Sequence, residues 1–455
     1  MRKLILRLIV VLVLATSLSS TPAQAKDALF DLSKDLLIGT WAEREAAADA
    51  MIERGGTDMV PSLVLLMRIG GAHKLTQRAL EALTGQKITT WREAMHYQEA
   101  HPDIKPHHSY YDLKLWYWSG IDQGFLTFFP DAEAAASDTH RIRFEEITWG
   151  GALADGIPPL DTPALIEADA AEYMLDTDLV FGVEINGDVR AYPLRIMGWH
   201  EMLNDVIGGV PVALAYCTLC GAGILFETQV AGQDAPFVFG SSGLLYRSNK
   251  LMFDRTTNSL WNQFTGKPVS GPLAHSGIIL GIRSTTITSW AEWRDRHPTT
   301  KVLSLETGYF RNYDSGVVYA DYFASPDLMF PTRTDQSRLL QKDHIYGIRV
   351  AGGAKAWPLT AFDAEPVIND QVGLINVVLI GDGHTQTVRA YDRGDLQFSG
   401  TGKDLVGPGG EWRVTEDALL GPKAQRLARV PGHVAYWFAW DGYLGAESAL
   451  YGVSD

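Results

Sequence analysis

Alternating apolar and polar positions occur in two distant stretches of the chain. Residues 180–194 read V-F-G-V-E-I-N-G-D-V-R-A-Y-P-L, and residues 345–359 read I-Y-G-I-R-V-A-G-G-A-K-A-W-P-L. Alternation on both sides of Asn186-Gly187 and of Gly352-Gly353 is typical of two strands joined by a tight hairpin. The second stretch follows the first at an offset of 165 without a gap. The pattern therefore predicts a hairpin that occurs twice.

The match continues beyond this hairpin. The further pairs at the same offset are 204–205 with 369–370, 212–214 with 377–379, and 226–227 with 391–392. Self-similarity at a fixed offset indicates a repeated structural unit. We therefore predict two copies of one β-rich module, at about residues 156–320 and 321–455.

Residues 26–100 have a helical pattern instead. Ala42–Arg54 is rich in Ala and Glu and is followed by Gly55-Gly56, which is typical of a helix and its C-terminal end. Thr89 or Thr90 can cap a later helix, with Glu93 near the capping-box position. We expect about four short helices in a HEAT-like stack, at Ala42–Arg54, Val60–Ile69, His73–Leu83 and Thr90–Ala100.

The first 25 residues resemble a cleaved secretory signal. A basic start (Arg2, Lys3 and Arg7) precedes the apolar run Leu8–Leu14 and the small-residue site Ala23-Gln24-Ala25. The apolar run is too short for an ordinary membrane-spanning helix, and no later run of about 18 apolar residues appears. We expect a periplasmic or secreted protein that does not span a membrane after cleavage.

Residues 101–155 form a linker-like segment rich in aromatic side chains, namely Tyr110, Tyr111, Trp116, Tyr117 and Trp118. Aromatic surfaces of this size favour burial, so we expect them to cover the seam between the helices and the β-rich copies. His101, His107 and His108 also lie close together, and a metal site there is an alternative. Their spacing matches no familiar set of ligands.

The only two cysteines, Cys217 and Cys220, lie between the apolar runs Val210–Tyr216 and Ile224–Thr228. A thioredoxin-like site would place such a pair at the start of a helix. The glycines after Cys220 oppose a helix, so we predict strand, tight turn and strand. In that frame C-x-x-C-G resembles a metal-binding knuckle, whose glycine permits the positive φ that the turn requires.

A metal site needs ligands besides these two thiolates. His200 is the first candidate, and Glu201 and Met252 are weaker ones. Sulfur and imidazole ligands together suit copper or zinc. His200-Glu201 also begins like the zinc-protease motif H-E-x-x-H, but position 204 is Asn, so we reject that interpretation.

Two metal-free interpretations of the cysteine pair stay open. In a thiol oxidoreductase, Cys217 would attack a substrate disulfide and Cys220 would resolve it. Alternatively, Cys217 and Cys220 form a structural disulfide in a non-catalytic protein-binding module, and His200 is a buried histidine bonded to the backbone.

Polar residues are dense between strand-like runs in residues 239–263. Arg247, Lys250, Asp254 and Arg255 can ring a pocket for an anionic ligand, because guanidinium groups bind carboxylates and phosphates well. The alternative is that Asp254 and Arg255 form a surface pair worth less than about 1 kcal/mol.

The two copies differ where the chemistry is expected. At the offset of 165, His200 aligns with Glu365, Cys217 with Asp382, and Cys220 with Thr385. Copy two therefore keeps the framework and lacks the sulfur atoms. The shared residues are most simply structural, and they are Gly182, Gly187, Pro193, Asn204 and Asp205.

Composition and charge narrow the class of protein. Apolar residues make up 46% of the chain, which is enough for real cores, and the formal net charge is −15. Without the three basic residues of the signal, 36 basic residues face 54 acidic ones, a net charge of −18. This charge opposes binding to nucleic acid, whose phosphates it would repel.

Several motifs together resemble a known family, the domain of unknown function number 3179. They cover roughly residues 150–455 and read F-G-V at 181, A-Y-P at 191, H-E at 200, N-D at 204, Y-C-T-L-C-G at 216, S-G-L-L-Y at 242, D-R at 254 and S-L-W at 259. The usual C-P-L-C-G of the family is C-T-L-C-G here, with Thr218 in place of proline. The resemblance implies no activity that can be transferred.

We conclude from the sequence that the fold is α+β, with N-terminal short helices followed by a β-rich, internally duplicated domain. The favoured function is binding of copper or zinc through Cys217, Cys220 and His200, in metal handling or redox chemistry. A thiol–disulfide oxidoreductase and a non-catalytic binding module are the alternatives. The expected partner is a small molecule or a protein.

Overall fold

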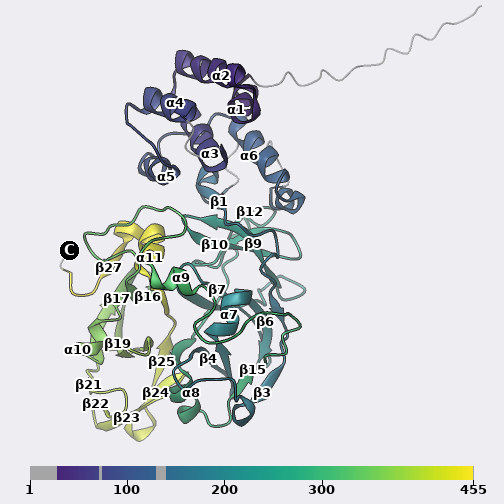
Figure 1. The fold of residues 1–455 in the computed structure, drawn as a ribbon. Helices are drawn as coiled ribbons and strands as arrows, with labels where there is room; N and C mark the ends of the chain where they lie inside the picture. The colour runs from purple at the N-terminus through teal and green to yellow at the C-terminus, as the bar shows by residue number, and fades with distance from the viewer. Residues whose placement is uncertain (1–27, 71–73, 130–139, 454–455) are drawn as a thin grey trace, which may run out of the picture.

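The computed structural model describes residues 28–70, 74–129 and 140–453. The expected signal at residues 1–25 lies outside the described residues. Figure 1 shows a group of helices standing on one end of a larger β-rich body, as the sequence predicted. Within the described residues, no helix combines the length and the apolar character needed to cross a membrane.

Six helices form the N-terminal region: α1 (Ala28–Ile38), α2 (Trp41–Arg54), α3 (Val60–Gly70), α4 (Lys74–Thr84), α5 (Trp91–Ala100) and α6 (Ser109–Ser119). The helix predicted at Ala42–Arg54 is α2, and Gly55 at its end has φ 66°. Thr90 caps α5 in a capping box with Glu93, which confirms that prediction. The HEAT-like character of the stack stays a prediction.

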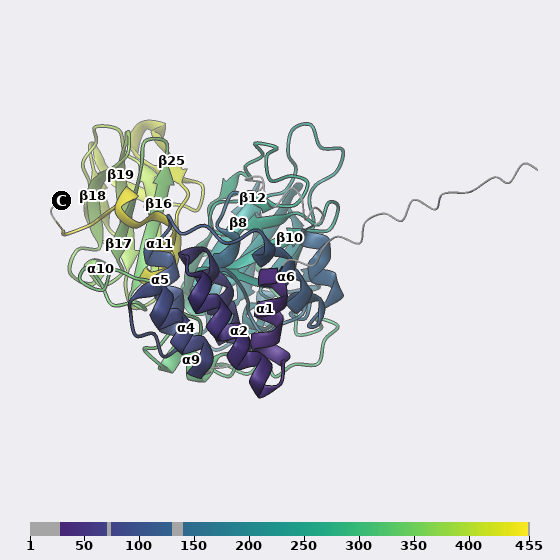
Figure 2. The ribbon, with the colours of Figure 1, turned by 90° about the horizontal axis from the view of Figure 1, so that it is seen from above.

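The aromatic segment joins this region to the β-rich body. Its residues 109–119 form α6 rather than an extended linker, and a 3₁₀ helix follows at Gln123–Phe128. Tyr110 and Trp118 belong to one buried cluster with Tyr246 and Phe253 of the first copy. The aromatic side chains thus cover the seam, as expected, and Figure 2 shows the helices lying over the first copy.

Three five-stranded sheets build the first copy and its contact with the helices. The first has the order β1 (Ile147–Trp149), β9 (Phe239–Tyr246), β10 (Asn249–Asp254), β11 (Leu260–Asn262), β12 (Lys267–Ser270). The second has the order β13 (Ile282–Arg283), β8 (Ala222–Glu227), β7 (Val210–Cys217), β6 (Met202–Ile207), β2 (Leu160–Asp161). The third has the order β14 (Thr286–Ser289), β4 (Leu179–Ile185), β5 (Asp188–Pro193), β15 (Lys301–Leu303), β3 (Leu165–Glu167). Helices α7 (Leu194–His200) and α8 (Trp290–Arg296) complete the copy.

Two sheets build the second copy. A four-stranded sheet has the order β26 (His433–Tyr436), β16 (His344–Val350), β17 (Gly353–Pro358), β27 (Ser448–Leu450). An eight-stranded sheet has the order β18 (Val367–Val372), β19 (Ile375–Asp382), β20 (Thr387–Asp392), β25 (Arg426–Val430), β24 (Ala418–Leu420), β23 (Gly410–Val414), β22 (Leu405–Gly407), β21 (Ser399–Gly400). Its helices are α10 (Ala361–Ala364) and α11 (Trp437–Leu444), and α9 (Ala320–Ala324) lies in the connection between the copies.

The strand register confirms the internal duplication. In the β4–β5 hairpin Val180 pairs with Pro193, and in the β16–β17 hairpin Ile345 pairs with Pro358, at the same offset of 165. The hairpins β6–β7 and β18–β19 also pair at equivalent positions. A shift by one residue would turn each apolar face to solvent, so the matching register means that these hairpins bury equivalent faces in the two copies.

The structure extends the duplication beyond the stretch that the sequence revealed. Helix α8 packs on β4 and helix α11 packs on β16, with Trp293 over Gly182 and Trp440 over Gly347. A Cβ atom on either glycine would overlap the ring of its tryptophan. Both glycines are therefore structural, because only hydrogen leaves room for the ring.

The shared N-D pairs are structural for a visible reason. The Asn204 amide exchanges two hydrogen bonds with the backbone of Phe239, and Asn369 does the same with Phe398. The carboxylate after each asparagine accepts a bond from a buried aromatic residue, Tyr192 to Asp205 and Trp357 to Asp370, at 2.9 Å in both copies. These residues stabilise the packing of one hairpin on the next.

Both copies contribute to one core. Phe181, Tyr192 and Leu214 of the first copy lie in the same buried cluster as Tyr346 and Trp357 of the second. The copies are therefore packed face to face rather than joined only by the chain.

Candidate functional site: a buried disulfide between two strands

The cysteine pair lies in the turn that joins β7 to β8. A disulfide links Cys217, the last residue of β7, to Cys220. The turn is closed by Cys220 N donating to Cys217 O at 3.1 Å and Gly221 N donating to Thr218 O at 3.3 Å. Gly221 has φ 59°, the left-handed conformation that glycine adopts freely. The predicted order of strand, tight turn and strand is confirmed.

Both cysteines are buried, Cys217 with 2% and Cys220 with 0% of its surface exposed. They share a cluster with Leu219 and Phe264 of the first copy and Trp437 of the second. Tyr436 N donates to Cys220 O at 2.8 Å, so a strand of the second copy fastens the turn. The disulfide therefore lies at the contact between the copies.

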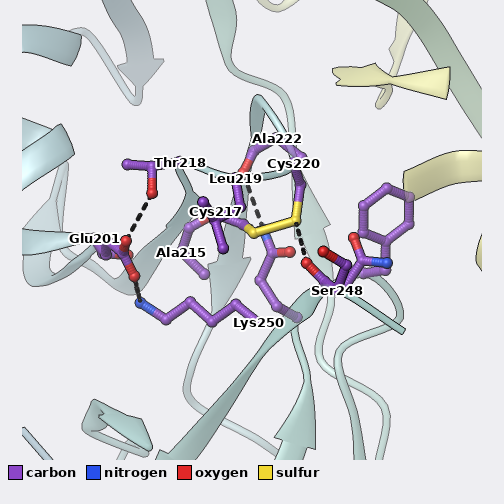
Figure 3. Close-up of a disulfide and its surroundings, with 12 residues drawn as sticks. Glu201, Ala215, Cys217, Thr218, Leu219, Cys220, Ala222, Ser248 and Lys250 are labelled. Atoms are coloured by element: carbon purple, nitrogen blue, oxygen red, sulfur yellow. Dashed lines mark hydrogen bonds and ion pairs between the residues drawn. A yellow bond between two sulfur atoms is a disulfide. The ribbon is translucent and has the colours of Figure 1, made fainter. Parts of the chain in front are cut away.

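A buried ion pair touches the turn (Figure 3). Thr218, between the two cysteines, donates from Oγ1 to Oε1 of Glu201 at 2.7 Å. Lys250 Nζ donates to the carbonyl of Glu201 at 3.1 Å and lies 3.3 Å from its Oε2. Burial lowers the pKa of Lys250, and the charge of Glu201 opposes that shift. The sequence placed Glu201 among possible metal ligands, whereas its carboxylate binds a cation of the protein.

The backbone of Glu201 is strained. It ends α7 with φ 56°, a left-handed conformation that costs a residue with a Cβ atom about 1–2 kcal/mol. Strain of this kind persists where the surroundings hold the residue in place, often at functional sites. Here the strained position directs the carboxylate at Thr218 and Lys250.

Gln263 bonds to both strands beside the disulfide, and no pattern in the sequence singles it out. Its Nε2 donates to Ala215 O at 2.9 Å on β7 and to Ala222 O at 3.1 Å on β8. The side chain is fully buried. Both bonds lie within the strands next to the turn, so Gln263 ties the cysteine hairpin to the end of β11.

The connecting segment, residues 304–343, covers the site. Tyr322 in α9 donates its hydroxyl to Leu219 O at 2.7 Å, inside the C-x-x-C turn. Tyr319 donates to Oε1 of Glu201 at 3.4 Å. Burial beside Glu201 raises the pKa of Tyr319 to about 12, so it stays a neutral donor. No periodicity in the sequence connects these tyrosines with the cysteines.

The chain matches, over residues 154–446, the family described as Protein of unknown function (DUF3179). It belongs to this family. No curated protein and no solved structure matches the chain. The DUF3179 region contains the disulfide, the Glu201–Lys250 pair, the connecting segment and nearly all of both copies.

In the DUF3179 region, the ring of His200 forms hydrogen bonds with residues other than the two cysteines. Its Nδ1 donates to Pro158 O at 2.9 Å, and its Nε2 accepts from the hydroxyl of Tyr313 at 2.6 Å, as neutral imidazole does. Burial lowers the pKa of His200, which favours this neutral form. Met252 packs in a different cluster from the cysteines, with Phe239 and Trp261.

These contacts give the metal hypothesis no support. The two sulfur atoms are bonded to each other, and His200 has protein partners on both nitrogens. Among the described residues, no group of three or more His, Cys, Asp or Glu side chains is arranged to hold a metal ion. His101 and His107 of the aromatic segment bond to Tyr97 O and Ser109 Oγ, respectively.

The four polar residues expected to ring an anion pocket in the DUF3179 region have separate partners. Arg247 pairs with Glu146 at 2.5 Å, and Lys250 pairs with Glu201. Asp254 accepts bonds from its own turn and from Trp261 Nε1, and Arg255 pairs with Asp155 at the surface. Of the four, Lys250 reaches the C-x-x-C turn, through Glu201. The structure does not bring the four together.

The equivalent turn of copy two keeps the backbone and loses the covering residues. Gln386 N donates to Gly383 O at 3.3 Å, as Gly221 N does to Thr218 O. Gln386 has φ 55°, close to the value of Gly221. Asp382 and Thr385, at the cysteine positions, line an open cavity instead of a core.

Proposed function

We propose that Cys217–Cys220 is a redox-active disulfide and that the protein acts by thiol–disulfide exchange. The observation that carries this proposal is the buried Glu201–Lys250 pair, which is bonded directly to the residue between the cysteines. Burying a carboxylate and an ammonium group is expensive, and a disulfide staple does not require it. A reaction that moves protons to and from thiolates does use such a pair.

The reaction is balanced without any further component. A substrate thiolate attacks Sγ of Cys217, the less enclosed sulfur, and Cys220 leaves as a thiolate. A second substrate thiolate then attacks the substrate sulfur of the mixed disulfide and releases Cys217. The substrate loses two electrons and becomes a disulfide, while the protein gains two thiols. In the reverse direction, Cys217 attacks a substrate disulfide and Cys220 resolves the product.

The Glu201–Lys250 pair handles the protons in this proposal. The Lys250 ammonium stabilises the thiolate that forms, and its lowered pKa makes it a better proton donor than a solvated lysine. Thr218 transmits the position of the Glu201 carboxylate to the turn. The predicted export of the chain fits this chemistry, because oxidising compartments preserve disulfides.

Access to the sulfur atoms requires movement of the connecting segment. Tyr319 and Tyr322 lie over the turn, and neither cysteine exposes more than 2% of its surface. Exchange therefore proceeds after these tyrosines leave Glu201 and Leu219, and its rate reports how often that opening occurs.

The test is a redox titration of the folded protein in glutathione buffers, with the thiols trapped by alkylation and counted by mass. We expect a reversible change between zero and two thiols per chain while the circular dichroism stays native. In the Cys220→Ala variant, glutathione should form a mixed disulfide on Cys217. In Lys250→Met, exchange should slow at least tenfold and lose part of its pH dependence, whereas the surface variant Arg255→Gln should match the wild type.

Thiols that appear only at urea concentrations that unfold the protein would contradict the proposal. Metal analysis of the reduced protein belongs to the same experiment. One copper or zinc ion per reduced chain, absent from a Cys217→Ser/Cys220→Ser variant, would favour the metal hypothesis over disulfide exchange.

A second candidate function is a non-catalytic binding module with a structural disulfide. The burial of both sulfur atoms in the contact between the copies favours it, because buried disulfides resist exchange. For this function, the titration should show reduction coupled to unfolding, and Lys250→Met should change stability without a separate effect on exchange.

A further inference from the structure

A large cavity lies at the second copy's counterpart of the disulfide site. It has a volume of about 1550 Å³ and lies between α8 of the first copy and β19, β20, β23 and β24 of the second. Figure 1 shows α8 beside β24, at the end of the molecule away from the N-terminal helices. Asp382 and Thr385, the counterparts of the cysteines, line it. This cavity is larger than the roughly 300–1,000 Å³ that encloses a single small ligand, so it suits an extended one.

An arginine on the wall of this cavity has spare hydrogen-bonding capacity. Arg389 is 2% exposed, and its Nε donates to Oε1 of Glu416 at 2.8 Å. Its Nη1 lies 3.3 Å from Oε1 of Glu292. In the described part of the chain, the buried Nη2 has no hydrogen-bond partner. Leaving a buried guanidinium donor unpaired is costly, so a ligand acceptor would be strongly favoured there.

The charges around Arg389 leave room for one anionic group. Its hydrogen-bonded network also contains Arg296, which pairs with Glu292, and Arg429, which reaches Glu416 through Thr286. Three guanidinium groups thus face the two carboxylates of Glu292 and Glu416. A carboxylate from a ligand would balance the network and pair with Arg389 in the geometry that guanidinium favours.

The rest of the lining selects against several ligand classes. Carboxylate and cationic side chains line the cavity in equal number, and threonine and serine hydroxyls lie between them. A polyphosphate or nucleic acid would face Asp363, Asp382 and Glu411, and an apolar ligand would strip water from all these charges. Ligand hydroxyl groups satisfy both kinds of wall, because each donates to a carboxylate and accepts from a cation.

We propose that this cavity binds an acidic oligosaccharide, with one sugar carboxylate paired to Nη2 of Arg389 and the sugar hydroxyls bonded to Asp382, Lys403 and their neighbours. The site is independent of the disulfide. The two copies of the fold then carry different sites at the same turn: a redox pair in the first and a sugar-binding cavity in the second.

Calorimetric titration with tetrasaccharides that each carry a single uronate residue among neutral sugars, in several linkages, tests the proposal. Each has a matched neutral control in which the carboxyl groups are reduced to alcohols. We expect at least one uronate tetrasaccharide to bind, and its reduced counterpart to bind at least tenfold more weakly. Absence of binding across the panel, or equal affinity for the reduced sugars, would overturn the proposal.

Variants then locate the site. Arg389→Lys keeps a cation beside Glu416 and Glu292 but lacks the forked donor, so we expect at least tenfold weaker binding. Asp382→Ala and Lys403→Met alter exposed side chains of the rim, and each should weaken binding several-fold even if Arg389→Lys fails to fold. Arg283→Gln, a surface variant of the first copy, should bind normally, as should Cys217→Ala/Cys220→Ala. Unchanged affinity in both rim variants would place the ligand elsewhere.

Discussion

The turn at Cys217–Cys220 and the turn at Asp382–Thr385 have the same backbone and opposite surroundings. The first is fastened by a disulfide, covered by the connecting segment and buried against the second copy. The second carries exposed side chains and borders a cavity of about 1550 Å³. The comparison teaches that the strands on either side determine the turn, while the segments packed over it determine its chemistry.

The framework of the two copies diverged much less than their turns. Trp293 packs on Gly182 and donates to Thr300 at 2.9 Å, and Trp440 packs on Gly347 and donates to Ser448 at 2.6 Å. Both tryptophans are fully buried. The residues that repeat therefore hold each copy together, and residues that differ are free to acquire separate functions.

The largest expected effect tests the equivalence of the frameworks. Trp293→Ala and Trp440→Ala should each lower the free energy of unfolding by about 3–5 kcal/mol, because each leaves a large cavity and removes a buried hydrogen bond. Urea unfolding followed by circular dichroism measures the loss, with Phe310→Ala, at a fully exposed side chain, as the control. A large loss for one tryptophan and none for the other would break the comparison.

Removing the disulfide should cost more stability than changing the equivalent residues in the turn of copy two. Cys217→Ala/Cys220→Ala should cost about 2 kcal/mol, since the unfolded chain loses the constraint of a four-residue loop. The matched variant Asp382→Ala/Thr385→Ala should cost less than about 1 kcal/mol, because Asp382 is exposed and its bonds are local. If both double variants lower the free energy of unfolding by the same amount in urea, the disulfide contributes no more stability than the side chains of the turn in copy two.

A half-buried histidine gives copy two a pH dependence that copy one lacks at the same position. His344 in β16 corresponds to Leu179 in β4, and burial lowers the pKa of His344 to about 4. In the unfolded chain the histidine takes up a proton near pH 6.5. The contribution of neutral His344 to the free energy of unfolding is therefore complete above that pH and is lost as the pH falls toward 4. Relative to His344→Leu, the wild type should lose about 1 kcal/mol between pH 7.5 and 5.5. Identical pH profiles in urea unfolding would contradict the assignment.

The smallest expected effect comes from substituting the residue that follows each turn. Gly221 and Gln386 both take a left-handed conformation, at φ 59° and 55°. Gly221→Ala should cost about 1 kcal/mol, because a Cβ atom there is strained and lies 3.3 Å from the ring of Tyr436. Gln386→Gly should add about 0.5 kcal/mol, since it relieves strain but loosens the unfolded chain. The midpoint temperature of thermal unfolding should therefore fall for Gly221→Ala and rise for Gln386→Gly.

Local patterns predicted the framework well because hairpins and caps depend on neighbouring residues. Asn186-Gly187 forms the tight turn expected, and Thr90 with Glu93 begins α5. In copy two the turn is Ala351-Gly352, one residue before the predicted Gly352-Gly353, because Gly353 already pairs with Val350. The strands around Cys217 and Cys220 also followed from the sequence. Each of these features depends on contacts within a few residues, which periodicity and turn chemistry encode directly.

The functional interpretation depended on contacts that periodicity does not encode. His200 is close to the cysteines in sequence, which suggested a shared metal, yet its ring bonds to Pro158 and to Tyr313 in the connecting segment. Lys250 and Arg255 are five positions apart in the sequence, but only Lys250 turns inward to Glu201. Their roles are decided by packing between elements.

The sequence by itself therefore determined that the chain contains a helical region and two copies of one β-rich unit, with a cysteine pair in the first. Tertiary structure decided that Tyr322 and Tyr436 enclose this pair, and that Asp382 and Arg389 border a cavity. The physical reason is the distance along the sequence between the residues that interact. Strands and turns arise from interactions along the chain, whereas burial, ion pairs and cavities arise where segments far apart in the sequence pack together.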